Sequence, residues 1–221
     1  MLAQGVTRYD LPLLADLICL GLLFWLVRKE NMRLRDLICF TRKHLLRDLC
    51  IGVGLFVALY IILFALSAGG VYLLLAHTAF FRNGQALEAL FGTTLLNPFG
   101  LPWHIAITTL LLPISSALLE EMVYRGYALP RLQVLTRRKW LAVLLTASGF
   151  GVQHIAFGLL SWPLALFSFL LAFIPGVLLG ILYLLTRQRL LPLILIHWQA
   201  DLITLGVVPL LLTMFFRSTP F

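Results

Sequence analysis

Charged residues are scarce in this chain of 221 residues. Asp, Glu, Lys and Arg make up 12% of it, whereas soluble globular domains have roughly 25%. Hydrophobic residues make up 61%, and so apolar a chain cannot cover itself with a polar surface in water. The composition therefore excludes a soluble enzyme, a disordered tail and a nucleic-acid-binding module, and it predicts an integral membrane protein.

Several other features are also missing. The three cysteines are odd in number and lack metal-ligand spacing, which favours small buried hydrophobes. Neither H-E-x-x-H nor G-x-S-x-G occurs. We find no internal repeat, and this argues against a carrier built from repeated halves. The N-terminal apolar run precedes its basic cluster, the opposite order to a signal peptide, so we expect a retained helix.

The apolar residues that are present form six long runs. A membrane-spanning helix needs about 20 residues, and the runs lie at about 11–27, 50–75, 103–125, 140–160, 163–186 and 190–216. We expect Pro175-Gly176 to interrupt the fifth run, and Pro209 to kink or split the last one into a possible seventh crossing. Between the second and third runs, QALEALF favours a short interfacial helix. The sequence thus predicts an all-α polytopic protein with a single transmembrane domain over 1–221 and about six transmembrane helices.

Basic residues give the orientation of these helices. Thirteen of the seventeen Lys and Arg residues fall in three alternate loops, at 28–47, 127–139 and 187–189. Because cytoplasmic loops carry an excess of Lys and Arg, we expect these loops in the cytoplasm and both termini outside. The net charge of +8 then reflects topology, and no anionic partner is needed to explain it.

Ionisable residues inside the apolar runs suggest function, because each costs roughly 3 kcal/mol or more there. In the third run, Glu121 and Arg125 are four residues apart and share a helical face, so Arg125 can neutralise Glu121. Glu120 points about 100° away, with Ser116 one turn back as a possible partner. Two adjacent carboxyls in a low dielectric cannot both ionise cheaply, which suits Glu120 to general acid/base chemistry.

Two further helices carry similar groups at a similar depth. His154 follows Phe150 by four residues, and His197 and Asp201 share one face of the last run. Together with Glu120, these groups lie about 12 to 22 Å along their helices from the nearest cytoplasmic basic residue. A single polar cavity near mid-membrane would explain this common level. Asp16 has no matching partner in the sequence, and we expect it to form a structural hydrogen bond.

Simpler explanations exist for each cluster. The Glu120 cluster could be a solvated helix end, and the histidines could be interhelical hydrogen bonds. If the groups are catalytic, Glu120 takes a proton from water with help from His154, and His197 and Asp201 stabilise the oxyanion. A zinc ion held by Glu120, His154 and His197, with a water in the fourth position, is the alternative. A non-catalytic immunity protein, a scaffold or a proton-coupled transporter remains the rival from another class.

Three motifs occur in order on successive helices: EEMVYRG, FGVQH and HWQAD. Together they resemble the pattern E-E-x-x-x-R, F-x-x-x-H and H-x-x-x-N or D of the CPBP intramembrane proteases, the CAAX-protease and bacteriocin-processing family also called Abi. The resemblance covers about 115–201, which would be the catalytic core. It implies a helical intramembrane endopeptidase that works without a cofactor, although its members were first described as metalloproteases.

By position, the resemblance assigns Glu120 and His154 to water activation, and Glu121 and Arg125 to support of the site. His197 and Asp201 would bind the oxyanion. In CAAX-type members the last position is Asn, and Asp201 can donate a hydrogen bond only when protonated, so His197 is the better donor. The expected partners are the lipid bilayer and a membrane-embedded or membrane-anchored protein or peptide, without nucleic acid. The expected location is a bacterial or archaeal plasma membrane.

Overall fold

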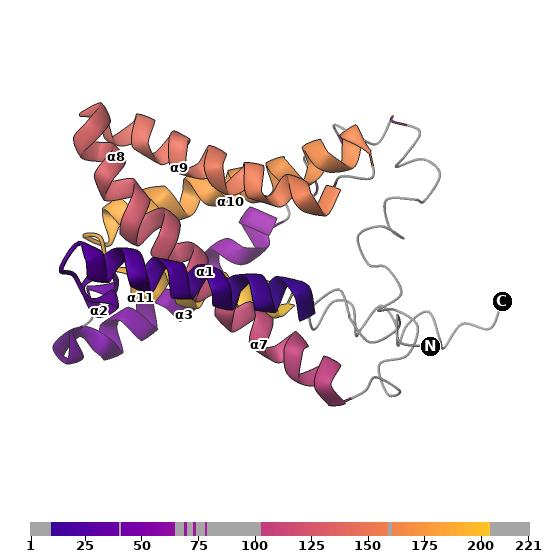
Figure 1. Cartoon of the computed structure of the whole chain (residues 1–221). Helices are drawn as coiled ribbons and strands as arrows, with labels where there is room; N and C mark the ends of the chain where they lie inside the picture. Colours follow the sequence, from indigo (N-terminus) through magenta and orange to yellow (C-terminus); the bar gives the residue numbers. More distant parts are fainter. Residues whose placement is uncertain are drawn as a thin grey trace.

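The computed structural model describes residues 10–39, 41–64, 69, 73, 78, 103–158 and 161–203, and this part of the chain is all-α (Figure 1). In chain order the helices are α1 (Asp10–Lys29), α2 (Leu34–Ile38), the 3-10 helix η1 (Arg42–His44), α3 (Leu45–Phe64), α7 (Trp103–Glu120), the π-helix η4 (Glu121–Ala128), α8 (Leu129–Thr136), α9 (Lys139–His154), the 3-10 helix η5 (Ile155–Gly158), α10 (Trp162–Leu185) and α11 (Leu190–Asp201).

The six longest of these helices are α1, α3, α7, α9, α10 and α11, and each overlaps one predicted apolar run. This confirms a helix in each run, although α3 begins at Leu45 rather than near residue 50, and the ends predicted near 75 and 216 lie outside the described residues. By length and composition alone, one helix among the described residues, α10, could cross a membrane. The QALEALF segment and the possible crossing at Pro209 lie outside the described residues.

Three expectations about helix boundaries were wrong. The segment 28–47 was expected to be a loop, but α2, η1 and the start of α3 lie within it. The segment 127–139 was expected to be a loop, but helical structure continues from α7 through η4 and α8 to Thr136. The Pro175-Gly176 pair was expected to interrupt the fifth run, yet α10 is continuous through Pro175. A proline at this position removes only the hydrogen bond to the Leu171 carbonyl, and membrane helices tolerate this. Here α10 packs against α9, where a Cβ at Gly176 would lie 3.2 Å from the Phe150 side chain.

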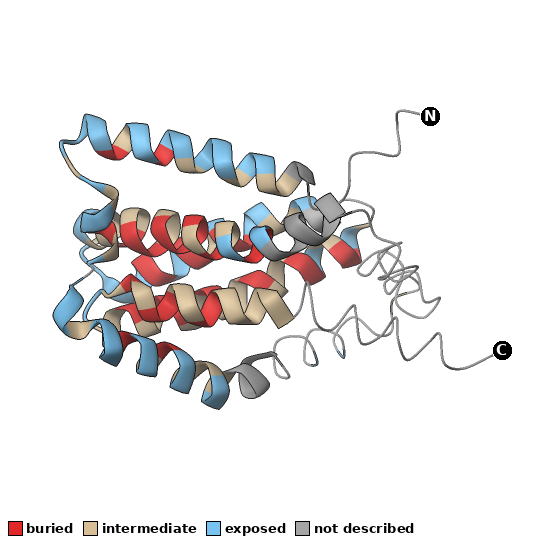
Figure 2. Cartoon of the chain, turned by 90° about the horizontal axis from the view of Figure 1, so that it is seen from below, coloured by how far each residue is buried: buried red, intermediate tan, exposed pale blue. Residues whose placement is uncertain are grey.

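The helices pack mainly in pairs: α9 with α10, α3 with α11, and α1 with α7. Close approach of α9 to α10 depends on glycine, because a Cβ at Gly180 would lie 2.9 Å from the Val143 side chain. Buried residues lie on the inward faces of the helices (Figure 2). The core includes Leu23, Val27, Met122, Leu129, Val143, Leu179, Tyr183, Leu190 and Leu193.

The outward faces of the same helices are also apolar. Leu22 and Trp25 on α1, and Leu144 and Leu145 on α9, are large exposed hydrophobic side chains. Extended apolar surface of this kind marks an interaction site or a lipid-facing surface. In a chain with so little charge, it fits contact with lipid.

The predicted basic segments meet at one end of the bundle. Arg189, just before α11, contacts Asp48 on α3 through its Nη2 and Nε atoms at 2.6 and 3.0 Å. Arg131 on α8 forms an ion pair with Glu30, just after α1. The pKa of Glu30 is lowered mainly by the hydrogen bond from the Tyr127 hydroxyl, and further by Arg131. The meeting of these segments is what a single cytoplasmic face requires.

Candidate active site

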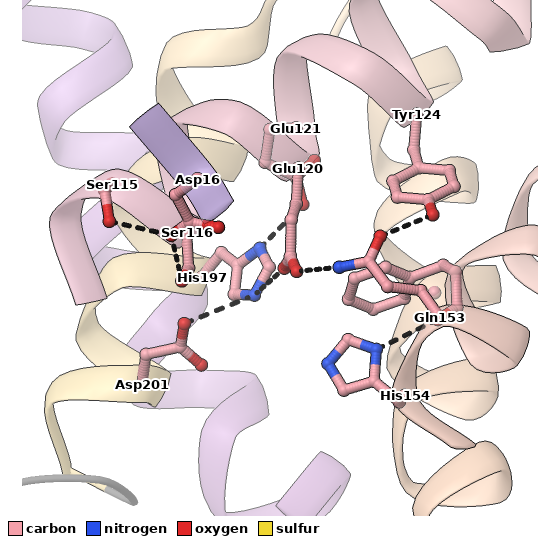
Figure 3. A network of polar contacts seen from close by, with 12 residues as sticks. Asp16, Ser115, Ser116, Glu120, Glu121, Tyr124, Gln153, His154, His197 and Asp201 are labelled. Carbon is pink, nitrogen blue, oxygen red and sulfur yellow. Dashed lines mark hydrogen bonds and ion pairs between the residues drawn. The ribbon is translucent and has the colours of Figure 1, made fainter. Parts of the chain in front are cut away.

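His197 is at the centre of a cluster of carboxyl groups (Figure 3). It lies on α11, and 8% of its surface is exposed. Its Nδ1 atom is 2.9 Å from Glu121 Oε1, and its Nε2 atom is 3.4 Å from Glu120 Oε2 and 3.6 Å from Asp201 Oδ2. The two ring nitrogens therefore face three carboxyl groups, and both can donate at once only when the ring carries two protons.

Glu121 and Arg125 form the buried support of this cluster. Their side chains are 0% and 1% exposed, and Arg125 Nη1 is 2.8 Å from Glu121 Oε1. Arg125 Nη2 also donates to the Gly176 carbonyl on α10 at 3.0 Å, and the guanidinium lies 5.0 Å from the centre of the Phe150 ring. The predicted pairing of Glu121 with Arg125 is confirmed. It connects η4 with α10 and, through His197, with α11.

Glu120 is the last residue of α7 and is 6% exposed. Its Oε1 atom accepts a hydrogen bond from Gln153 Nε2 on α9 at 2.7 Å, while Oε2 faces His197. Ser116 was considered as its partner on the same helix, but the Ser116 hydroxyl donates to Asp16 instead. Glu120 is thus held from α9 and α11, and its carboxylate is the point where these two helices meet α7.

The acidic pair stands where the helix changes type. The π-helix η4 begins at Glu121, directly after the α-helical Glu120. Single π-helical turns inside α-helices are frequent at functional sites. The two adjacent carboxyls, which a regular helix would direct about 100° apart, both reach the ring of His197.

His154 flanks this cluster from the end of α9. Its Nδ1 atom is 2.9 Å from the Phe150 carbonyl oxygen, and its ring packs edge-on against the Phe150 ring with 4.6 Å between centroids. Figure 3 shows the ring extending from α9 toward the side on which Glu120, His197 and Asp201 lie. Phe150 also packs against His197, with 5.9 Å between ring centroids, so it separates and positions both imidazoles.

Sequence reasoning missed some residues of the site. Gln153 and Tyr124 were not selected, although Gln153 directly precedes His154 and Tyr124 follows Glu120 by four residues. Asp16 was expected to form a structural hydrogen bond, and this is confirmed: its Oδ2 atom accepts from the Ser115 and Ser116 hydroxyls at 2.8 and 2.9 Å. These two bonds fix α1 to α7 one turn before Glu120.

We predict that Asp16→Ala destabilises the protein by about 1 kcal/mol, the usual worth of a polar contact between membrane helices. The change removes the acceptor that both serine hydroxyls share on α7. Asp16→Asn, which keeps one side-chain oxygen, should lose less. Unfolding of the full chain by SDS in mixed micelles measures both, and equal stability of wild type and Asp16→Ala would contradict the prediction.

The predicted residues therefore converge, from α7, η4, α9 and α11. Among the residues that the structure describes, no three His, Cys, Asp or Glu side chains are arranged to hold a metal ion. The zinc alternative stays a prediction, and we derive no step through a metal.

A comparison with models of protein families matches residues 102–203 to the model "Rce1-like: Type II CAAX prenyl endopeptidase Rce1-like". The matched segment contains all six predicted site residues. Asp16, on α1, lies outside it. No curated protein and no solved structure matches the chain.

Proposed function

We propose, from the premise that residues 102–203 form a CPBP domain of the Rce1-like type II CAAX prenyl endopeptidase family, that the chain is an intramembrane endopeptidase. This family is an integral membrane family of proteases. In the proposal, Glu120 activates the water that attacks the peptide bond. The observation that carries the proposal is the position of Glu120. Its carboxylate is buried, is held from two other helices, and stands beside an imidazole that faces two further carboxyl groups.

In the proposed reaction, Glu120 accepts a proton from a water molecule as the water oxygen attacks the carbonyl carbon of the scissile peptide bond. His154 orients the water from α9. His197, with a proton on each ring nitrogen, donates from Nε2 to the oxyanion that forms. The carbon–nitrogen bond then breaks, and Glu120 returns the proton to the leaving nitrogen. Preorganised donors in a site without bulk water are the largest source of rate enhancement in such reactions.

The neighbouring groups have supporting roles in this mechanism. Glu121, paired with Arg125, accepts from Nδ1 of His197 and fixes the ring. Asp201 stands 3.6 Å from Nε2 of the same ring. Because an ionised Asp accepts hydrogen bonds and cannot donate them, its proposed role is to orient His197 rather than to bind the oxyanion itself.

The proposed substrate is a peptide or protein held at the membrane by a lipid anchor or by its own apolar segment. CAAX prenyl endopeptidases, the family matched here, cleave prenylated proteins anchored to membranes. A leader peptide and a C-terminal sorting helix are the other substrates of this kind that we consider. We further propose six membrane crossings in a bacterial or archaeal plasma membrane, with the basic end of the bundle in the cytoplasm.

Purified full-length protein in lipid nanodiscs tests the function. It is incubated with a prenylated CAAX peptide, the same peptide without the prenyl group, and an apolar helical peptide, and the products are identified by mass spectrometry. We expect cleavage of an anchored peptide and none of the unanchored one. A second measurement compares the termini of membrane proteins in membranes that contain wild type or Glu120→Gln. The proposal fails if no anchored peptide is cut and these termini are the same.

Chelation tests the absence of a metal from the reaction. We expect peptide cleavage to continue at an unchanged rate after dialysis against EDTA or 1,10-phenanthroline, because every proposed step uses side chains of the chain itself. Activity that disappears on chelation and returns with added zinc would show that the metal-free mechanism is wrong. The proposed peptidase activity on an anchored peptide would still be supported by the substrate assay in that case.

A further inference from the structure

Gln153 connects the carboxylate of Glu120 with a tyrosine on the other side (Figure 3). Its Nε2 atom donates to Glu120 Oε1 at 2.7 Å, and its Oε1 atom accepts from the Tyr124 hydroxyl at 2.7 Å. The Tyr124 hydroxyl has a second acceptor nearby, the Gly149 carbonyl oxygen at 3.3 Å. The three side chains form a continuous chain of hydrogen bonds that ends at the proposed base.

The polarity of this chain follows from the chemistry of its members. A side-chain amide donates through nitrogen and accepts through oxygen, and a carboxylate only accepts. The Gln153 amide must therefore turn its nitrogen to the carboxylate of Glu120, which leaves its oxygen for the Tyr124 hydroxyl. In this way Tyr124 fixes the orientation of the amide, and the amide fixes Oε1 of Glu120.

The same three groups can also serve Glu120 after it has taken a proton from water. The amide then turns over, so that its oxygen accepts from the new O–H of Glu120 and its nitrogen donates to the Tyr124 oxygen. The Tyr124 hydroxyl then rotates and donates its hydrogen bond to the Gly149 carbonyl oxygen, which lies 3.3 Å away. Every donor keeps an acceptor in both arrangements, and this is the condition for a polar group to be retained near the membrane interior.

We propose that Gln153 is a positioning residue for Glu120, oriented by Tyr124, and that it holds the Glu120 carboxylate toward the reacting water. The proposal rests on the proposed function and adds two residues that act through the base. Gln153 itself is exposed and Tyr124 is half-buried, so neither side chain belongs to the buried core. The Tyr124 ring additionally packs edge-on against Phe150, with 5.3 Å between centroids, and keeps this contact without its hydroxyl.

The test compares Gln153→Met and Tyr124→Phe with wild type. Both variants keep the approximate volume of the side chain and remove the hydrogen bonds. Because a displacement of about 1 Å in a reacting group can cost about 100-fold in rate, we expect kcat to fall by about 10- to 100-fold for Gln153→Met and by less for Tyr124→Phe. KM and thermal stability should remain unchanged. Val152→Met, which places the same side chain at an exposed neighbouring position of α9, is the matched control and should keep full activity.

Infrared spectroscopy of the purified protein adds a readout that needs no substrate. The carboxyl band of Glu120 is assigned as the band lost in Glu120→Gln, and it should shift in Gln153→Met because a hydrogen bond to its oxygen is lost. An unshifted band, an unchanged kcat, or a loss of kcat matched by a loss of stability would each overturn the proposal. If wild type cuts no peptide at all, the proposed function fails while the infrared shift still decides whether Gln153 holds Glu120.

Discussion

Glu120→Gln is expected to lower kcat/KM for an anchored peptide by about 10²- to 10⁴-fold, the usual contribution of a general base. Gln has nearly the same shape as Glu and can still accept from the Gln153 amide at Oε1, but it cannot take a proton from water. The loss should therefore appear in kcat, with KM little changed. Initial rates in nanodiscs, followed by mass spectrometry over a range of substrate concentrations, measure the two constants separately.

Two further variants make this prediction specific. Glu120→Asp keeps a carboxylate but withdraws it by one methylene group from Gln153 and His197, so we expect an intermediate loss. Glu30→Gln removes a carboxylate at the basic end of the bundle, where Glu30 pairs with Arg131, and it should leave kcat unchanged. Full activity of Glu120→Gln would assign water activation to another group and would favour a non-catalytic role for this cluster.

The helices could be predicted from the sequence because each is a local pattern. An apolar run of about 20 residues is a property of consecutive residues, and each of the six runs overlaps one of the six longest described helices. The details that failed depend on neighbours. Helical structure continues beyond Arg125 into the expected loop, where η4 packs against α9 and α11. The helix α10 remains continuous through Pro175, where it packs against α9.

The site shows the same division between local and distant contacts. Glu121 and Arg125 are one helical turn apart, and their ion pair followed from spacing alone. The similar depth of Glu120 and His197 predicted that they would meet, but not which atoms would do so. That Glu121, rather than Glu120, makes the shorter contact with His197 depends on the helix rotation around the π-helical segment.

The contacts of Asp16 and Gln153 could not be predicted in this way. Ser115 and Ser116 contact Asp16 across 99 and 100 residues of chain, and Gln153 contacts Glu120 across 33. A serine or glutamine carries no charge, so its presence in an apolar run gives a weak signal. The partner of such a residue depends on which helices pack together, here α1 with α7 and α9 with η4. Hydropathy does not specify this pairing.

Arg125→Met is expected to give the largest loss of stability, about 3–5 kcal/mol. The substitution leaves Glu121 buried at 0% exposure without its cation and also removes the donor to the Gly176 carbonyl. Removing one partner of a buried ion pair is costly because the remaining charge stays desolvated. The free energy of unfolding of the full chain, measured with SDS in mixed micelles, gives the value directly.

A double-mutant cycle separates the ion pair from the other contacts of Arg125. Glu121→Gln combined with Arg125→Met should be less destabilising than the sum of the two single changes, because the double variant leaves no unpaired charge. Arg131→Met breaks the partly exposed pair with Glu30 and should change stability by at most about 1 kcal/mol. Two outcomes would show that the buried pair does not stabilise the site: a loss of stability for Arg125→Met smaller than that for Arg131→Met, or strictly additive losses in the cycle. His197 would then need another support for its orientation between the carboxyl groups.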